Sequence, residues 1–196
     1  MICSVKRVAV LSLLVATTIQ AGAFNTFEFT SEFGHSLECM DDSLLTGACT
    51  AGRKKDCNNQ QSASGVECNR GNTTNVEEHP GLGGDAIARG WKEIASCPNG
   101  EFAFARCSSG RNRDCEVGSD FYAHALWCRN FDNYKYDDNE KPVAVCGGPG
   151  ERTRCPAGTA VIASCGAGRH ADCAIESCRK QGEVFTQLLC QKYVEI

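Results

Sequence analysis

The chain has 196 residues, 15 of them cysteine, and it carries a formal net charge of −4 with a pI near 5.6. This charge balance provides no basic surface for phosphate backbones or anionic lipids, which argues against nucleic acid as a partner. The density of cysteine indicates instead a fold that disulfides stabilise.

Residues 1–23 have the three parts of a secretory signal peptide. Lys6 and Arg7 precede an apolar stretch from Val8 to Ala16, and a run of small residues ends at Ala23. The apolar stretch is shorter than the ~20 residues that a membrane-spanning helix needs. We therefore expect cleavage after Ala23, a secreted, extracellular protein with no membrane insertion, and a single domain over residues 24–196.

The fourteen cysteines that remain after cleavage are even in number and regularly spaced, which predicts a disulfide framework. No Cys-x-x-Cys occurs, and the four histidines form no repeated ligand pairs, so we expect neither a metal nor another cofactor. The framework would use Cys39, Cys49, Cys57, Cys68, Cys97, Cys107, Cys115, Cys128, Cys146, Cys155, Cys165, Cys173, Cys178 and Cys190.

One pattern, Cys-x-x-Gly-Arg-x-x-Asp-Cys, occurs three times, at residues 49–57, 107–115 and 165–173. The interval from Gly52 to Gly110 equals that from Gly110 to Gly168, and the flanking cysteines keep the same register. This spacing, which we call the repeat interval, predicts three tandem repeats, at approximately 24–80, 81–141 and 142–196.

Each repeat has four cysteines, which leaves three possible pairings open. Cys146 and Cys178 lie outside the register of the repeats. We expect these two cysteines to pair with each other.

The segments between these cysteines predict strands. "EFAFARC" at 101–107 alternates at period two, and "GTAVIASC" at 158–165 is rich in β-branched residues. A second strand is predicted before the last cysteine of each repeat, in "SGVEC" at 64–68, "HALWC" at 124–128 and "QLLC" at 187–190. No segment has a convincing helical period, so the predicted class is all-β.

The first repeat has few large apolar residues, and a free-standing domain of ~60 residues buries only about 60% of its surface. We therefore expect the three repeats to turn their sheets toward a common axis and to share one core. At matching positions, the predicted inner faces carry Leu44 and Thr46, Phe102 and Phe104, and Ala160 and Ile162.

Short motifs carry a resemblance to a known family. The second and third repeats open with "CPNG" at 97–100 and "CPAG" at 155–158 and close with "LWC" and "LLC", and Gly90-Trp91 precedes the second opening. These features resemble the vitelline membrane outer layer protein I family. The resemblance implies a β-prism of three Greek-key sheets around a pseudo-threefold axis. It also implies an alternative function, an enzyme acting on amino-sugar oligosaccharides.

The residue types of the repeated loops are explained first by turn chemistry. Glycine reaches positive φ without steric cost where the chain reverses, and the aspartate can accept backbone N–H bonds or pair with the arginine. A functional interpretation uses the same residues, because a guanidinium beside a carboxylate can bind sugar hydroxyls and three equivalent clusters gain from avidity. The candidate ligand-binding residues are Arg53, Asp56, Arg111, Asp114, Tyr122, Arg169 and Asp172.

The leading functional hypothesis is a non-enzymatic extracellular binding or structural protein whose partner is a glycan or matrix component. A secreted effector, toxin or inhibitor is a further alternative, and the sequence leaves the oligomeric state open. No catalytic triad or carboxylate pair can be singled out. Trp127 is expected to be buried, and residues 131–140 are expected to form a solvated connector. Asn72 in Asn72-Thr73-Thr74 is a candidate glycosylation site.

Overall fold

The computed structural model describes a protein built from β-strands, and its described residues contain no helix. The described residues are 27–30, 33–40, 42–51, 57, 62–70, 73–76, 85–109, 115–166, 173, 178 and 184–196. The predicted all-β class is confirmed. Three predictions fall outside these residues: the signal peptide at 1–23, the acceptor Asn72 and the interior of each repeated loop.

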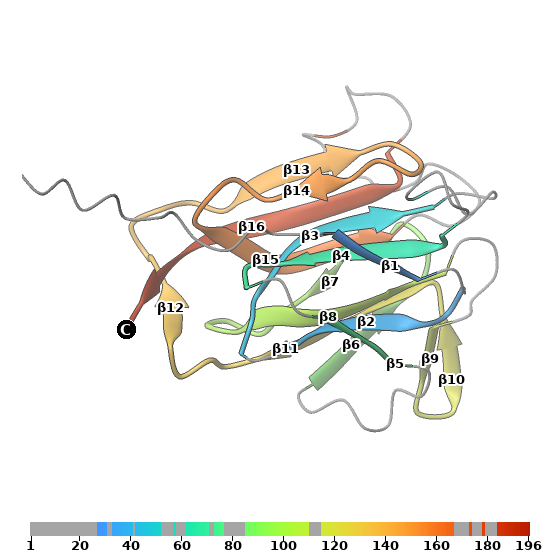
Figure 1. Ribbon diagram of the computed structural model, residues 1–196, viewed down its shortest axis with the longest axis horizontal. Coiled ribbons are helices and arrows are strands. Elements are labelled where there is room, and N and C mark those ends of the chain that lie inside the picture. The colour runs from blue at the N-terminus through green and yellow to red at the C-terminus, as the bar shows by residue number, and fades with distance from the viewer. Residues whose placement is uncertain are drawn as a thin grey trace, which may run out of the picture.

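The strands form three sheets and one separate hairpin (Figure 1). The first sheet has the order β1 (Phe27–Thr30), β4 (Ser64–Cys68), β3 (Leu45–Thr50) and β14 (Thr153–Arg154). The second has the order β5 (Thr73–Val76), β2 (Ser36–Cys39), β8 (Phe102–Ser108), β11 (His124–Arg129) and β6 (Asp85–Arg89). The third has the order β12 (Tyr134–Tyr136), β16 (Thr186–Glu195), β15 (Thr159–Gly166) and β7 (Ala95–Ser96), with β13 (Val143–Gly147) also paired to β16. The hairpin joins β9 (Cys115–Val117) to β10 (Asp120–Tyr122).

An antiparallel pair lies at the centre of each sheet: β3 with β4, β8 with β11, and β15 with β16. β8 and β15 match the segments predicted at 101–107 and 158–165, and β4, β11 and β16 match those predicted before the last cysteine of each repeat. β3 takes the corresponding place in the first sheet. Each pair has a register shift, next to Leu45, Trp127 and Val161 respectively. A β-bulge of this kind increases the local twist of a strand pair, which helps a sheet to curve around a core.

Each sheet also contains a strand from a neighbouring part of the chain. The strands β2, β7 and β14 pair with β8, β15 and β3, respectively. The residues that face one another across these pairs are Leu37 and Arg106, Ala95 and Ser164, and Thr153 and Ala48. Successive residues are one repeat interval apart in two sets. One set is Leu37, Ala95 and Thr153, and the other is Ala48, Arg106 and Ser164. The exchange therefore runs in a closed cycle through the three sheets.

Seven disulfides link the fourteen cysteines. Three long bridges end on β4, β11 and β16, the second strands of the three central pairs: Cys39–Cys68, Cys97–Cys128 and Cys155–Cys190. Three short bridges close the repeated loops: Cys49–Cys57, Cys107–Cys115 and Cys165–Cys173. The seventh, Cys146–Cys178, is the pair expected outside the register. The expectation that each repeat uses its four cysteines internally agrees with these pairs.

A single apolar cluster draws its members from all three sheets, so it lies between them. It includes Leu45 and Val66 of the first sheet, Leu126 of the second, and Val161 and Leu188 of the third. The shared interior explains how the N-terminal part of the chain, which has few large apolar residues, is stabilised by strands from the rest of the chain. Burial of a side chain of this size stabilises a protein by about 1.5–3 kcal/mol.

The predicted inner faces were wrong by one residue. The shared cluster contains Leu45, Ala103 and Val161, whereas Leu44, Phe102, Phe104 and Ala160 lie in a second cluster with Ile162 packed against it. Thr46 is also absent from the shared cluster, and its Oγ1 donates to the carbonyl of Glu67 over 3.2 Å. Both faces of these strands are apolar, so the alternation does not reveal which face points inward. The small Ala103 lies inside and the bulky phenylalanines lie outside.

The second cluster covers the outer face of the second sheet. Trp127 is buried there, as expected, together with Phe102 and Tyr134. Tyr136 and Tyr193 from the C-terminal part of the chain pack edge-on against the Phe102 ring, at centroid distances of 4.7 and 6.3 Å. Aromatic rings therefore link the second sheet to strands β12 and β16 of the third.

Candidate functional site

The three repeated loops start from strand ends that lie close together. Thr50, Ser108 and Gly166 end β3, β8 and β15, and each is the second residue of a repeated loop. The Ser108 Oγ lies 3.4 Å from the Thr50 Oγ1. A Cβ atom on Gly166 would lie 3.0 Å from the Ser108 Oγ. The three strand ends therefore meet at one end of the shared core, which we call the loop-bearing end.

The six charged candidates in the loops, Arg53, Asp56, Arg111, Asp114, Arg169 and Asp172, lie outside the described residues. The cysteines at the two ends of each loop are described. Cys57, Cys115 and Cys173 are buried, as are their partners in the three short bridges. The structure thus describes how each loop is attached to the body of the protein.

A buried arginine connects the strands beneath this end. Arg106 of β8 is fully buried and faces inward from the position that Ala48 and Ser164 occupy in the other two central strands. Its Nε donates to the Ser164 Oγ over 2.9 Å, its Nη1 to the Cys49 carbonyl over 3.3 Å and its Nη2 to the Thr50 Oγ1 over 2.7 Å. One side chain from the second sheet therefore bonds to both other sheets.

Burial lowers the pKa of Arg106 to about 10, so the guanidinium is still cationic at neutral pH. Its three hydrogen-bond acceptors in the described part of the chain are neutral. Gly166 makes room for this group, because a Cβ there would lie 3.0 Å from the Arg106 Nη2. Thr50 and Ser108 occupy the matching positions on the other two strands. Only Gly166 lacks a side chain there, and this leaves space for the Arg106 guanidinium.

Further polar side chains lie at the same level. Ser64, His124 and Thr186 lie opposite Thr50, Ser108 and Gly166 on the paired strands, and all three are fully buried. The Ser64 Oγ, the Thr186 Oγ1 and both His124 ring nitrogens have no hydrogen bond of ordinary geometry among the described residues. The interior is thus apolar along most of its length and polar at the loop-bearing end.

Tyr122 is the one candidate ligand-binding residue that the structure describes. It lies on β10, opposite Cys115, and packs half-buried against the second cluster. Its neighbour Phe121 is 55% exposed on the same hairpin. Sequence reasoning selected Tyr122 and missed Phe121. Successive side chains of a strand point to opposite faces, so the half-burial of Tyr122 turns the Phe121 ring toward solvent. This alternation could have identified Phe121 from the sequence.

The prediction of a solvated connector at 131–140 is wrong in part, because Phe131 and Tyr134 are buried and β12 lies within the segment. The segment is also bonded to β16. The Lys192 Nζ lies 3.3 Å from the Asp137 Oδ2 and 3.3 Å from the Glu140 Oε1. Gln191 Nε2 donates to the backbone carbonyls of the same two residues. Within the described residues, no group of three or more potential ligands could hold a metal ion.

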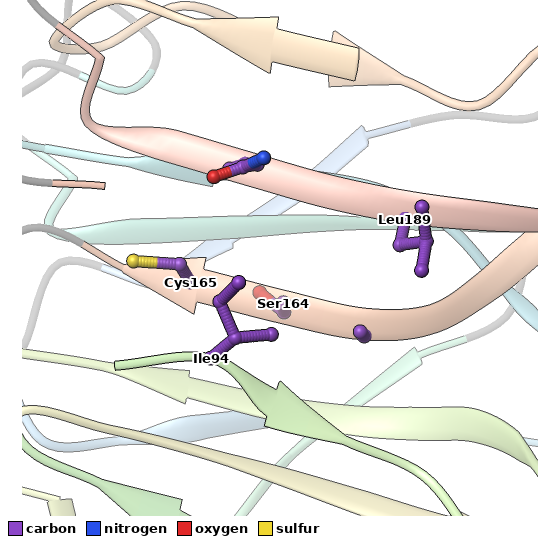
Figure 2. Close-up of a pocket in the computed structure, with 6 residues that line it drawn as sticks. Ile94, Ser164, Cys165 and Leu189 are labelled. Carbon is purple, nitrogen blue, oxygen red and sulfur yellow. The ribbon is translucent and has the colours of Figure 1, made fainter. Parts of the chain in front are cut away.

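A small hollow lies on the third sheet, against the segment that follows β6 (Figure 2). It has no enclosed space large enough for a water molecule, so it is not a small-molecule pocket, which typically encloses ~300–1,000 Å³. Ile94 reaches over Ser164 and Cys165, and Ala163, Gln187 and Leu189 complete the lining. Cys165 is disulfide-bonded, and none of the six residues carries a carboxylate or an imidazole. This hollow therefore offers no acid–base pair.

Comparison with protein-family models, with curated proteins and with solved structures found no match in any of the three. In the part of the chain that the structure describes, no helix is long and apolar enough to cross a membrane. The fold and its bridges define a disulfide-rich, all-β protein of a type common in oxidising, extracellular compartments.

Proposed function

We propose that this is a secreted, non-enzymatic protein that binds an extracellular glycan or matrix component through its three Cys-x-x-Gly-Arg-x-x-Asp-Cys loops. The observation that carries the proposal is the meeting of Thr50, Ser108 and Gly166 at one end of the core. Because each of these residues is the second residue of a loop, three copies of one polar motif start from a single end.

The architecture we propose is a β-prism of three repeats around a pseudo-threefold axis. The cyclic strand exchange, whose paired positions recur at the repeat interval, supports this arrangement. The three long bridges and the three short bridges also recur at matching positions. The resemblance to the vitelline membrane outer layer protein I family implies the same architecture.

The chemistry of the loops suits sugar hydroxyls. Arg53, Arg111 and Arg169 each offer planar guanidinium donors, and an aspartate three residues further on offers acceptors. Single contacts of this kind are weak, but linked sites can raise the overall affinity by about 10²–10⁴-fold when one ligand engages them together. The exposed Phe121 ring, on the hairpin that follows the second loop, adds a surface on which a sugar face can stack.

An array of extracellular glycans that includes N-acetylglucosamine oligomers tests the proposal, with a turnover assay on the same oligomers. We expect binding without release of shorter oligomers. Turnover would favour the alternative of an enzyme acting on amino-sugar oligosaccharides. Binding to no glycan, together with capture of a protein target, would favour the effector, toxin or inhibitor alternative.

Secretion would also expose Asn72 to glycosylation, which mass spectrometry of the secreted protein can detect.

A further inference from the structure

His124 is a buried histidine at the loop-bearing end. It begins β11, where it lies between Ser108 of β8 and Arg89 of β6, and it has no exposed surface. On the facing strand, a Cβ atom at Gly166 would lie 3.3 Å from the His124 Cβ. The ring therefore belongs to the packing that holds the strand ends of the second and third sheets together.

The charges that act on His124 from the described residues are positive. β8 contributes the Arg106 guanidinium, and β6 contributes Arg89. β15 contributes Ser164 and Gly166, which carry no charge.

Among the described residues, the carboxylates on the nearby segments supply no compensating charge. The Glu93 carboxylate accepts from the Gly90 N–H, and Glu116 on β9 is exposed at the hairpin. Neither carboxylate is among the groups that favour the protonated ring. Burial, followed by Arg106 and then Arg89, lowers the pKa of His124 to about 3, against a weaker opposing effect of the Ser164 and Glu93 backbones.

We propose that His124 is an acid-sensitive latch, whose protonation separates the strand ends at Thr50, Ser108 and Gly166. A proton on the ring would place a second cation beside Arg106 in the same buried region. Opening this end lets water solvate the imidazolium and so removes the conflict. The bridges Cys107–Cys115 and Cys165–Cys173 stay intact and keep the loops attached to their strands. Opening therefore separates the packed strand ends without detaching the loops.

The pH range follows from the two states of the ring. In the open state the ring is solvated, with a pKa near the ordinary 6.5, whereas in the closed state the pKa is about 3. The open state thus binds more protons between these values. The closed state is fully favoured above pH 6.5 and loses stability as the pH falls toward 3. One proton is linked to opening, so the opening constant should rise about tenfold per pH unit in this range.

Amide hydrogen exchange of the full mature chain between pH 6.5 and 4.5 tests the latch. The intrinsic exchange rate falls about tenfold per pH unit, and a tenfold rise in opening cancels this fall. Amides at Thr50, Ser108, His124 and Gly166 should therefore exchange at nearly constant rates. In His124→Gln their rates should fall about tenfold per unit, and in the control His35→Gln they should stay constant.

The latch concerns the fold and stands whether or not the loops bind a glycan, so its failure and a failure of glycan binding are separate results. Wild-type rates that fall tenfold per unit at all four amides would overturn it, and so would a His124→Gln variant that retains constant rates. If His124→Gln does not fold, the wild-type rates and an NMR titration of the His124 ring decide the matter. A ring that titrates near pH 6.5 without opening would contradict the proposal.

Discussion

Arg106→Ala should lower the free energy of unfolding by roughly 3 kcal/mol, as measured by denaturant titration with the disulfides intact. The substitution leaves a void between the three sheets. It also removes the donors that satisfy the Ser164 Oγ, the Cys49 carbonyl and the Thr50 Oγ1, all of which are buried. A buried acceptor without a partner costs about 1–3 kcal/mol, and the cavity adds to that cost.

Two further variants separate volume from hydrogen bonding. Arg106→Met keeps most of the volume and removes the buried charge, so we expect it to cost less than Arg106→Ala. Arg89→Ala is a matched control, because Arg89 is exposed on an edge strand and its Nη1 bonds only to the adjacent Ala88 carbonyl among the hydrogen bonds described for it. It should change stability by less than about 0.5 kcal/mol. A cost for Arg106→Ala as small as that of Arg89→Ala would mean that the guanidinium does not join the sheets.

A fragment of residues 24–80, oxidised to form Cys39–Cys68 and Cys49–Cys57, should not unfold cooperatively. In the whole chain, β2 pairs with β8 and β3 pairs with β14, so the fragment would lose a partner strand on each. Leu37, Leu45 and Val66 would also lose the facing side of the shared cluster. We expect a broad thermal response by circular dichroism and no protected core amides.

The matched control is the full mature chain under the same oxidising conditions, which should give a sharp transition. If the fragment also gave a sharp transition with its two bridges in place, each repeat would be an independent domain. The strand exchange would then be a docking contact and not a requirement for folding.

The strands and the set of cysteines that form bridges were accessible from the sequence because the cysteines repeat. A constant repeat interval fixes equivalent positions without any knowledge of the fold. The choice among the three pairings within a repeat was not accessible. It depends on which strand ends come together, and the structure joins the first cysteine to the last and the second to the third.

The constant cysteine spacing does not reveal which face of the central strands points into the shared core. It also does not reveal the role of Arg106. In "EFAFARC" both faces are apolar up to Arg106, which looks like a strand residue turned toward solvent. The signal that was available is the comparison of positions one repeat interval apart, which places Arg106 with the small residues Ala48 and Ser164 and places Gly166 with Thr50 and Ser108. The two-residue strands β7 and β14 are too short to leave a pattern, so the exchange between repeats was hidden as well.

The most direct test of the central proposal is the affinity for immobilised N-acetylglucosamine oligomers of the mature wild-type protein, of Arg111→Ala and of the triple variant Arg53→Ala, Arg111→Ala and Arg169→Ala. If the three loops act together, the single variant should bind somewhat more weakly. The triple variant should lose about a hundredfold or more, while the melting temperatures stay close to that of the wild type. Full affinity in the triple variant, with the fold intact, would show that the loops are structural turns and that binding, if it occurs, lies elsewhere.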